Sequence, residues 1–151
     1  MKTSEPFLQQ TVDSVLETLP PVWDRIRSNF RAAATGKFGI TLEQFHVLRH
    51  IRRGYQSVGE LAEKRQISRS AISQVVEVLV EKGLVTRRQE SDDRRCVRLE
   101  LTPDASKVLD ANFQENRAWM TGRMASLTPD QLSRVRGVMG ILRKTFTPEE
   151  S

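Results

Sequence analysis

The chain has 151 residues, of which 38% are hydrophobic and 28% charged, and it carries a formal net charge of +5. This composition can bury a core and stay in solution, and a pI near 9.9 favours an anionic partner. The one cysteine excludes an internal disulfide framework. No apolar run approaches the roughly 20 residues of a membrane span, and none follows the pattern of a signal peptide. We therefore expect a cytoplasmic protein.

The first predicted element is a long helical region from about residue 5 to residue 35. Pro20 and Pro21 lie inside it, and because proline lacks the amide hydrogen of an inner helical turn, we expect a break or a kink there. Apolar residues recur at helical spacing in two stripes. These are Phe7, Val12, Val15, Leu16 and Leu19, followed by Val22, Trp23, Ile26 and Phe30.

Three short helices are predicted next, each begun by a hydroxyl residue. Thr41 and Ser57 each stand three residues before a glutamine or a glutamate, which is the spacing of a capping box. Ser68 can cap the third helix, and Gly83 can end it in the left-handed conformation. Only a tight turn near residues 65–67 separates the second helix from the third, so the pair predicts a helix-turn-helix.

The second helix of such a pair is sized to lie in the major groove of DNA. Its solvent side is predicted to present hydroxyl and amide groups that can hydrogen-bond base edges, while Ala71 can touch a thymine methyl group. The alternative is an exposed helix face whose small polar residues have no partner. The predicted major-groove residues are Ser68, Arg69, Ser70, Ala71, Ser73 and Gln74.

A β-hairpin follows this helix. Val97, Leu99 and Leu101 alternate with polar residues, which is the two-residue period of a half-buried strand. Residues 84–89 are the expected partner strand, and residues 90–95 form the polar loop between them.

The tip of the hairpin places Arg94 and Arg95 next to Asp93. A guanidinium on a β-ribbon can enter the narrow minor groove of A·T-rich DNA, and a neighbouring carboxylate can orient it. The alternative is a surface cluster of ion pairs. Phosphate contacts are predicted for Arg65, Lys82, Arg87 and Arg88.

Two further helices are predicted, over residues 103–125 and 129–146. Thr102 and Thr128 are each followed by proline and aspartate, which suit the first turn of a helix. Both helices carry apolar stripes. These are Val108, Leu109, Phe113, Met120 and Met124, and then Leu132, Val135, Met139, Leu142 and Phe146.

Taken together, residues 70–85, Arg87, residues 93–95 and residues 99–102 resemble the MarR family of winged helix-turn-helix regulators. The resemblance implies a mainly α fold with a small β-hairpin wing. It implies a DNA-binding lobe at residues 41–102, flanked by dimerisation helices at residues 1–40 and 103–151. It also implies that Arg94 enters the minor groove, that Asp93 orients it, and that the helix begun by Ser68 faces the major groove.

The expected protein is thus a homodimeric regulator of transcription that binds a pseudo-palindromic site on double-stranded DNA. The resemblance further implies a repressor released by a small molecule bound between the dimerisation helices and the DNA-binding lobe. Two alternatives remain: the apolar stripes could all pack into one monomeric core, and the winged helix could bind a protein without specific DNA binding. No catalytic motif is found, so we expect no enzyme activity and no cofactor.

Two weaker candidate sites complete the sequence analysis. Glu43, His46 and His50 are predicted on the polar side of one helix, where the two histidines are weak candidate metal ligands. Cys96 follows the wing arginines, whose charge would favour its thiolate, and is a weak candidate for redox sensing. For both, an ordinary structural role is the more frequent explanation.

Overall fold

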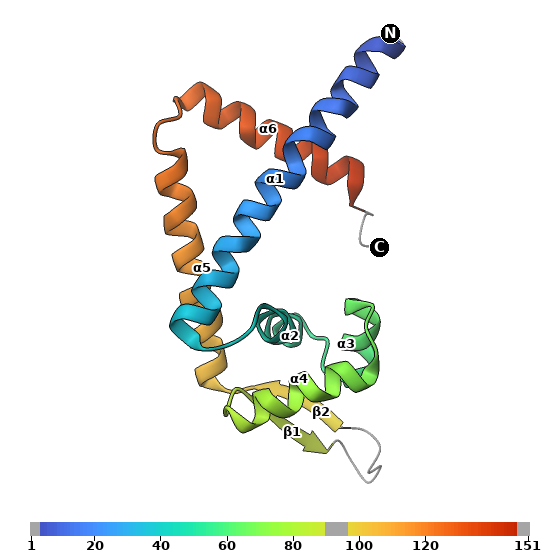
Figure 1. The fold of residues 1–151 in the computed structure, drawn as a ribbon, viewed down its shortest axis with the longest axis vertical. Coiled ribbons are helices and arrows are strands. Elements are labelled where there is room, and N and C mark those ends of the chain that lie inside the picture. The colour runs from blue at the N-terminus through green and yellow to red at the C-terminus, as the bar shows by residue number, and fades with distance from the viewer. Residues whose placement is uncertain (1–3, 90–96, 148–151) are drawn as a thin grey trace. The chain divides into compact units, whose positions relative to one another are not determined.

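The computed structural model describes residues 4–89 and 97–147 of the chain (Figure 1). Helices dominate these residues, and two strands form one antiparallel hairpin, as the sequence predicted. In chain order the elements are α1 (Glu5–Phe38), α2 (Leu42–Arg52), α3 (Val58–Arg65), α4 (Arg69–Glu81), β1 (Val85–Gln89), β2 (Val97–Leu101), α5 (Pro103–Met124) and α6 (Pro129–Phe146).

The predicted helix boundaries follow from side-chain capping. The hydroxyls of Thr41, Ser57 and Thr128 accept hydrogen bonds from the amide three residues on, and the glutamine or glutamate there accepts from the cap amide. Ser68 accepts from the amide of Ala71 in the same way. These contacts satisfy amides that would otherwise lack partners at each helix start.

The expected break at Pro20 and Pro21 is absent, because α1 runs through both residues as one helix. A proline inside a helix leaves the carbonyl four residues earlier without its partner. Those carbonyls belong to Leu16 and Glu17, which are exposed, so water can satisfy them.

The hairpin pairs Val85 with Leu101 and Gln89 with Val97. A third segment joins its edge, since the amide of Leu99 donates to the carbonyl of Gln56, at 2.7 Å, in the loop before α3. This hydrogen bond attaches the hairpin to the helix-turn-helix, a link that sequence periodicity did not indicate.

The hydrophobic core lies among α2, α3, α4, the hairpin and the start of α5. Each element contributes its apolar face, Ala34 adds the end of α1, and Ile40 adds the segment that follows it. Its largest fully buried apolar residues are Ile40, Val47, Leu48, Leu61, Ile72, Val76, Leu79, Val85, Leu99 and Leu109.

The chain divides into two compact units, Met1–Asn116 and Arg117–Ser151, and the division falls inside α5. The assignment of functional regions to residues 1–40, 41–102 and 103–151 stays a prediction. Within the part of the chain that the structure describes, no helix is both long enough and apolar enough to span a membrane.

Candidate nucleic-acid interface

Helices α3 and α4 form a helix-turn-helix joined by a tight turn. Gln66 ends α3 in the left-handed conformation, with φ of 54°, and the amide of Ile67 donates to the carbonyl of Ala62 at 3.1 Å. Ser68 then caps α4. The turn is therefore closed by the backbone itself, which fixes the angle between the two helices.

Helix α4 separates a buried apolar face from an exposed polar face. Ile72, Val76 and Leu79 point into the core. The predicted major-groove residues lie on the other side. Ser68, Arg69, Ser70, Ser73 and Gln74 are exposed, and Ala71 is half-buried. These groups are free to meet a ligand, although the hydroxyl oxygen of Ser68 already accepts the cap hydrogen bond.

The two-stranded hairpin lies beside α4 (Figure 1). Its predicted tip residues, Asp93, Arg94 and Arg95, lie outside the described residues, as does Cys96. The described ends of the strands, Gln89 and Val97, are exposed.

Each of the four predicted phosphate-binding cations already has a partner within the protein. Arg65 donates two hydrogen bonds to Glu43, from Nε at 3.1 Å and from Nη2 at 2.7 Å. The Arg65 hydrogen bond is the main reason why the pKa of Glu43 lies below its usual value. Lys82 donates to the carbonyl of Gly39 at 2.6 Å, at the C-terminus of α1.

The remaining two pair with carboxylates near the hairpin. Arg87 lies 2.8 Å from Glu77, and Arg88 lies 3.6 Å from Glu100. Arg69, at the start of α4, forms no ion pair or hydrogen bond with the described residues. A phosphate would have to displace a partner at the four predicted positions, whereas no described residue pairs with Arg69.

The two histidines on α2 do not share a polar face, and this expectation is wrong. His50 is only 5% exposed and packs edge-on against Tyr55, with ring centroids 5.7 Å apart. Burial lowers the pKa of His50 and lowers that of His46 to about 4. Glu43, the neighbouring carboxylate, is held by Arg65.

The described residues contain no group of three or more histidine, cysteine, aspartate or glutamate side chains able to hold a metal ion. The Nδ1 atoms of His46 and His50 are buried without a hydrogen-bond partner. Nearby Arg49 and Arg65 further disfavour a positive charge there.

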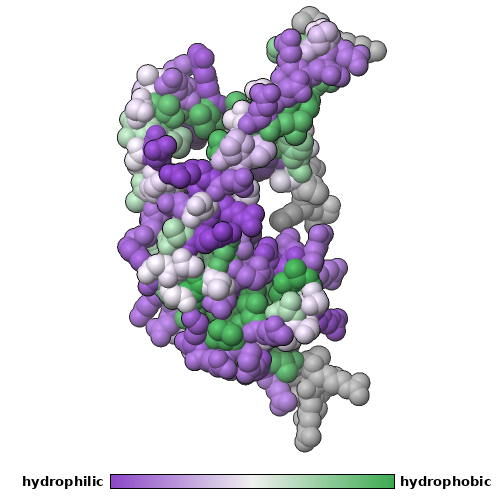
Figure 2. Space-filling view, in the orientation of Figure 1, coloured by the Kyte–Doolittle hydropathy of each residue, from purple (hydrophilic) through white to green (hydrophobic). Residues whose placement is uncertain are grey.

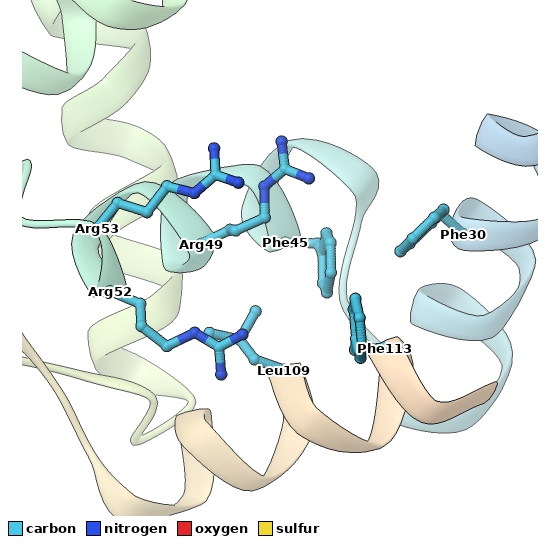
Figure 3. A pocket seen from close by; sticks show the side chains of 7 residues that line it. All are labelled: Phe30, Phe45, Arg49, Arg52, Arg53, Leu109 and Phe113. Carbon is cyan, nitrogen blue, oxygen red and sulfur yellow. The ribbon is translucent and has the colours of Figure 1, made fainter. Parts of the chain in front are cut away.

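A cavity of about 190 Å³ opens between α1, α2 and the first half of α5. Figure 3 shows the phenyl rings of Phe30, Phe45 and Phe113 gathered at this cavity, with arginines extending from α2. Its remaining lining residues are Arg49, Arg52, Arg53 and Leu109.

The arginines give the cavity a positive charge. Arg52 pairs with Asp110 at 2.6 Å, but Arg49 and Arg53 form no ion pair with the described residues. Burial and the charge of Arg53 lower the pKa of Arg49, whose Nε is buried without a partner. The cavity thus offers aromatic walls and donors for an anion. The i, i+4, i+7 spacing of Phe45, Arg49 and Arg52 in the sequence places them on one helix face, but periodicity alone did not indicate a cavity there.

A buried asparagine network, which the predicted apolar stripes did not indicate, joins α1 to α5. Asn112 and Asn116 are 0% and 2% exposed. Asn29 donates to Asn116 Oδ1 at 2.7 Å, and Asn116 donates to the carbonyl and Oδ1 of Asn112 at 2.8 and 3.0 Å. Asn112 and Asn116 continue the helical spacing of the apolar residues Val108 and Leu109, and this pattern in the sequence could have indicated buried asparagines.

Large apolar side chains remain exposed on the flanking helices. On α1, Phe7, Leu16 and Trp23 are 63%, 65% and 56% exposed, and apolar patches along this helix are visible in Figure 2. Phe113 and Met120 on α5 are also exposed. On α6, within the second unit, the exposed residues are Leu132, Val135, Val138, Met139, Ile141 and Phe146.

Comparison with known proteins identifies similar chains. The model of the MarR family matches residues 38–95. The "HTH-type transcriptional repressor MdtR" of Bacillus subtilis is 25% identical over 115 residues, which cover 76% of this chain and 74% of that protein.

Solved structures share the fold. A MarR family protein from Bacillus stearothermophilus aligns with a TM-score of 0.80 at 20% identity, over 93% of this chain and 98% of that one. Wild-type MarR from E. coli in its apo form aligns with a TM-score of 0.66 at 21% identity, over 97% and 100% of the two chains.

Proposed function

Because this chain belongs to the MarR family of winged helix-turn-helix transcription regulators, we propose that it represses transcription by binding a specific double-stranded DNA site. The observation that carries the proposal is the exposed polar face of α4. Arg69, Ser73 and Gln74 there present groups that can hydrogen-bond base edges, while the opposite face holds the helix on the core.

In this proposal α4 lies in the major groove and Arg94, oriented by Asp93, enters the adjacent minor groove. Arg95 contributes to the same contact. The four paired cations, Arg65, Lys82, Arg87 and Arg88, remain candidates for phosphate binding by exchange of partners. Such exchange costs little at the exposed pairs, because an exposed ion pair contributes only about 0–1 kcal/mol.

We further propose that the protein acts as a homodimer in the cytoplasm and catalyses no reaction. The exposed apolar side chains of α1, α5 and α6 support dimerisation, because water contact with so many of them is unfavourable. A symmetric dimer would present two copies of α4 to two half-sites about 10 base pairs apart. The site would then be pseudo-palindromic.

The arginine-lined cavity supports release by a small molecule. Its aromatic walls fit a flat apolar group, and Arg49 and Arg53 fit an anionic substituent. The cavity is lined by α2, by α1, which precedes the DNA-binding lobe in the sequence, and by α5, which follows it. A bound molecule can therefore shift α1 and α5 relative to α2. Binding of such a molecule would then favour a conformation with lower DNA affinity.

The test is selection of bound fragments from a random oligonucleotide library. A symmetric consensus supports the proposal, and the absence of any enriched sequence favours a protein-binding module instead. On the consensus, Arg94→Ala should weaken binding by about 1–3 kcal/mol in gel shifts. Arg25→Ala removes an exposed arginine from α1 and should bind normally. Equal affinity for wild type and Arg94→Ala would contradict the wing contact.

A further inference from the structure

Gly59 lies in the first turn of α3, and Arg69 is the first residue of α4. A Cβ atom at position 59 would lie 3.1 Å from Arg69 Nη2 and 3.4 Å from Cζ. The first distance is shorter than an ordinary carbon contact. A side chain at position 59 would therefore require the guanidinium to shift from its present position by a few tenths of an ångström.

Among the described residues, Arg69 has Gly59 as a close neighbour and no ion-pair partner. The other predicted DNA-facing cations of the described residues are held by carboxylates or by a carbonyl, as with Arg65 and Lys82. Arg69 has no such partner there, and an exposed arginine without a partner samples many rotamers. Lying against Gly59 limits those rotamers without occupying any guanidinium N–H group.

We propose that Gly59 is a positioning residue for DNA binding: its lack of a side chain lets the Arg69 guanidinium lie at the junction of α3 and α4, ready to bind DNA. This inference rests on the proposed function. Holding the side chain before binding reduces the entropy lost when the complex forms, so the contact raises affinity without touching the DNA itself.

The experiment is a double-mutant cycle of Gly59→Ala and Arg69→Ala, measured by fluorescence anisotropy on the selected operator. Restricting one long side chain corresponds to about a 3- to 10-fold change in affinity. Gly59→Ala should therefore weaken binding by that factor when Arg69 is present, and by less than about twofold when residue 69 is alanine. Equal losses in both backgrounds, or no loss in either, would overturn the inference.

Gly36→Ala is the matched control, because Gly36 is an exposed glycine inside α1 with open space around it. Both glycine substitutions should keep or raise the melting temperature, since alanine favours a helix more than glycine does. Only Gly59→Ala should weaken DNA binding. Weaker binding by Gly36→Ala to the same extent would show a general effect of helix stability and would contradict the assignment.

A measurement without DNA separates this inference from the proposed function. In ¹⁵N relaxation experiments, the Arg69 Nε–Hε group should be more ordered in the wild type than in Gly59→Ala. Equal order in the two proteins would refute the contact even if DNA binding is found. If no oligonucleotide is selected, the proposed function fails. The role of Gly59 in DNA binding then fails with it, even if the Arg69 side chain is more ordered in the wild type.

Discussion

Replacing Asn116 by alanine should destabilise the first unit more than the loss of a single polar side chain usually does. Asn116 is 2% exposed and takes part in three hydrogen bonds, to Asn29 and to the carbonyl and Oδ1 of Asn112. The substitution leaves Asn112 Oδ1 without its donor in a fully buried position, which costs about 1–3 kcal/mol. Asn29 is only half-buried, so water can replace its lost acceptor.

Adding the small cavity left by the side chain, we expect a loss of about 2–4 kcal/mol in the free energy of unfolding. Asn29→Ala should cost less, about 1 kcal/mol, because it leaves only Asn116 Oδ1 without its donor, while Asn116 keeps the two hydrogen bonds that its Nδ2 donates to Asn112. The assay is urea denaturation followed by circular dichroism at one fixed protein concentration, since the proposed dimerisation would make stability depend on concentration.

Gln114→Ala, an exposed substitution on the same helix, is the control and should change stability by less than about 0.5 kcal/mol. In the double mutant of Asn29 and Asn116, the two losses should fall short of their sum by about 0.5–1.5 kcal/mol. A loss below about 0.5 kcal/mol for Asn116→Ala, or strictly additive losses, would refute the role given to this network.

Stability should also fall as the pH drops from about 6.5 toward 4. Burial lowers the pKa of His46 to about 4 and also lowers the pKa of His50. The histidines of the unfolded chain take up protons near pH 6.5, so acid favours the unfolded state over this range. Allowing for solvent screening, the loss in the free energy of unfolding is on the order of 1–2 kcal/mol. Denaturation at about pH 7 and about pH 5 measures it, and His46→Gln should make the difference between the two pH values smaller. An unchanged difference would count against the burial effect. Gly83 ends α4 with φ of 70°, so Gly83→Ala should lower the unfolding free energy by about 1 kcal/mol, whereas Gly122→Ala inside α5 should raise it by about 0.5–1 kcal/mol. A melting-temperature comparison in which both substitutions act in the same direction would contradict this assignment. Arg49→Gln removes a positive charge from the cavity, so an aromatic carboxylate such as benzoate should raise the melting temperature of the wild type more than that of this variant. Equal shifts would argue against an anion site between α1, α2 and α5.

Sequence by itself determined the local elements of this protein, because their signals lie within a few residues of each other. The spacing of Thr41 and Ser57 to their capping partners, the left-handed glycine at position 83 and the alternation from Val97 to Leu101 each report local backbone preferences. The family resemblance rested on the same short-range order, and it correctly predicted a winged helix-turn-helix.

Tertiary structure alone decided the contacts between residues far apart in the chain. The partner of Arg65 is Glu43, 22 residues away, and that of Asn29 is Asn116, 87 residues away. Helical periodicity says which residues share a face but not which helix that face meets, so it placed His50 on a polar side although Tyr55 covers it. The aromatic and arginine cavity has the same origin, since its walls come from three helices whose packing no short segment encodes.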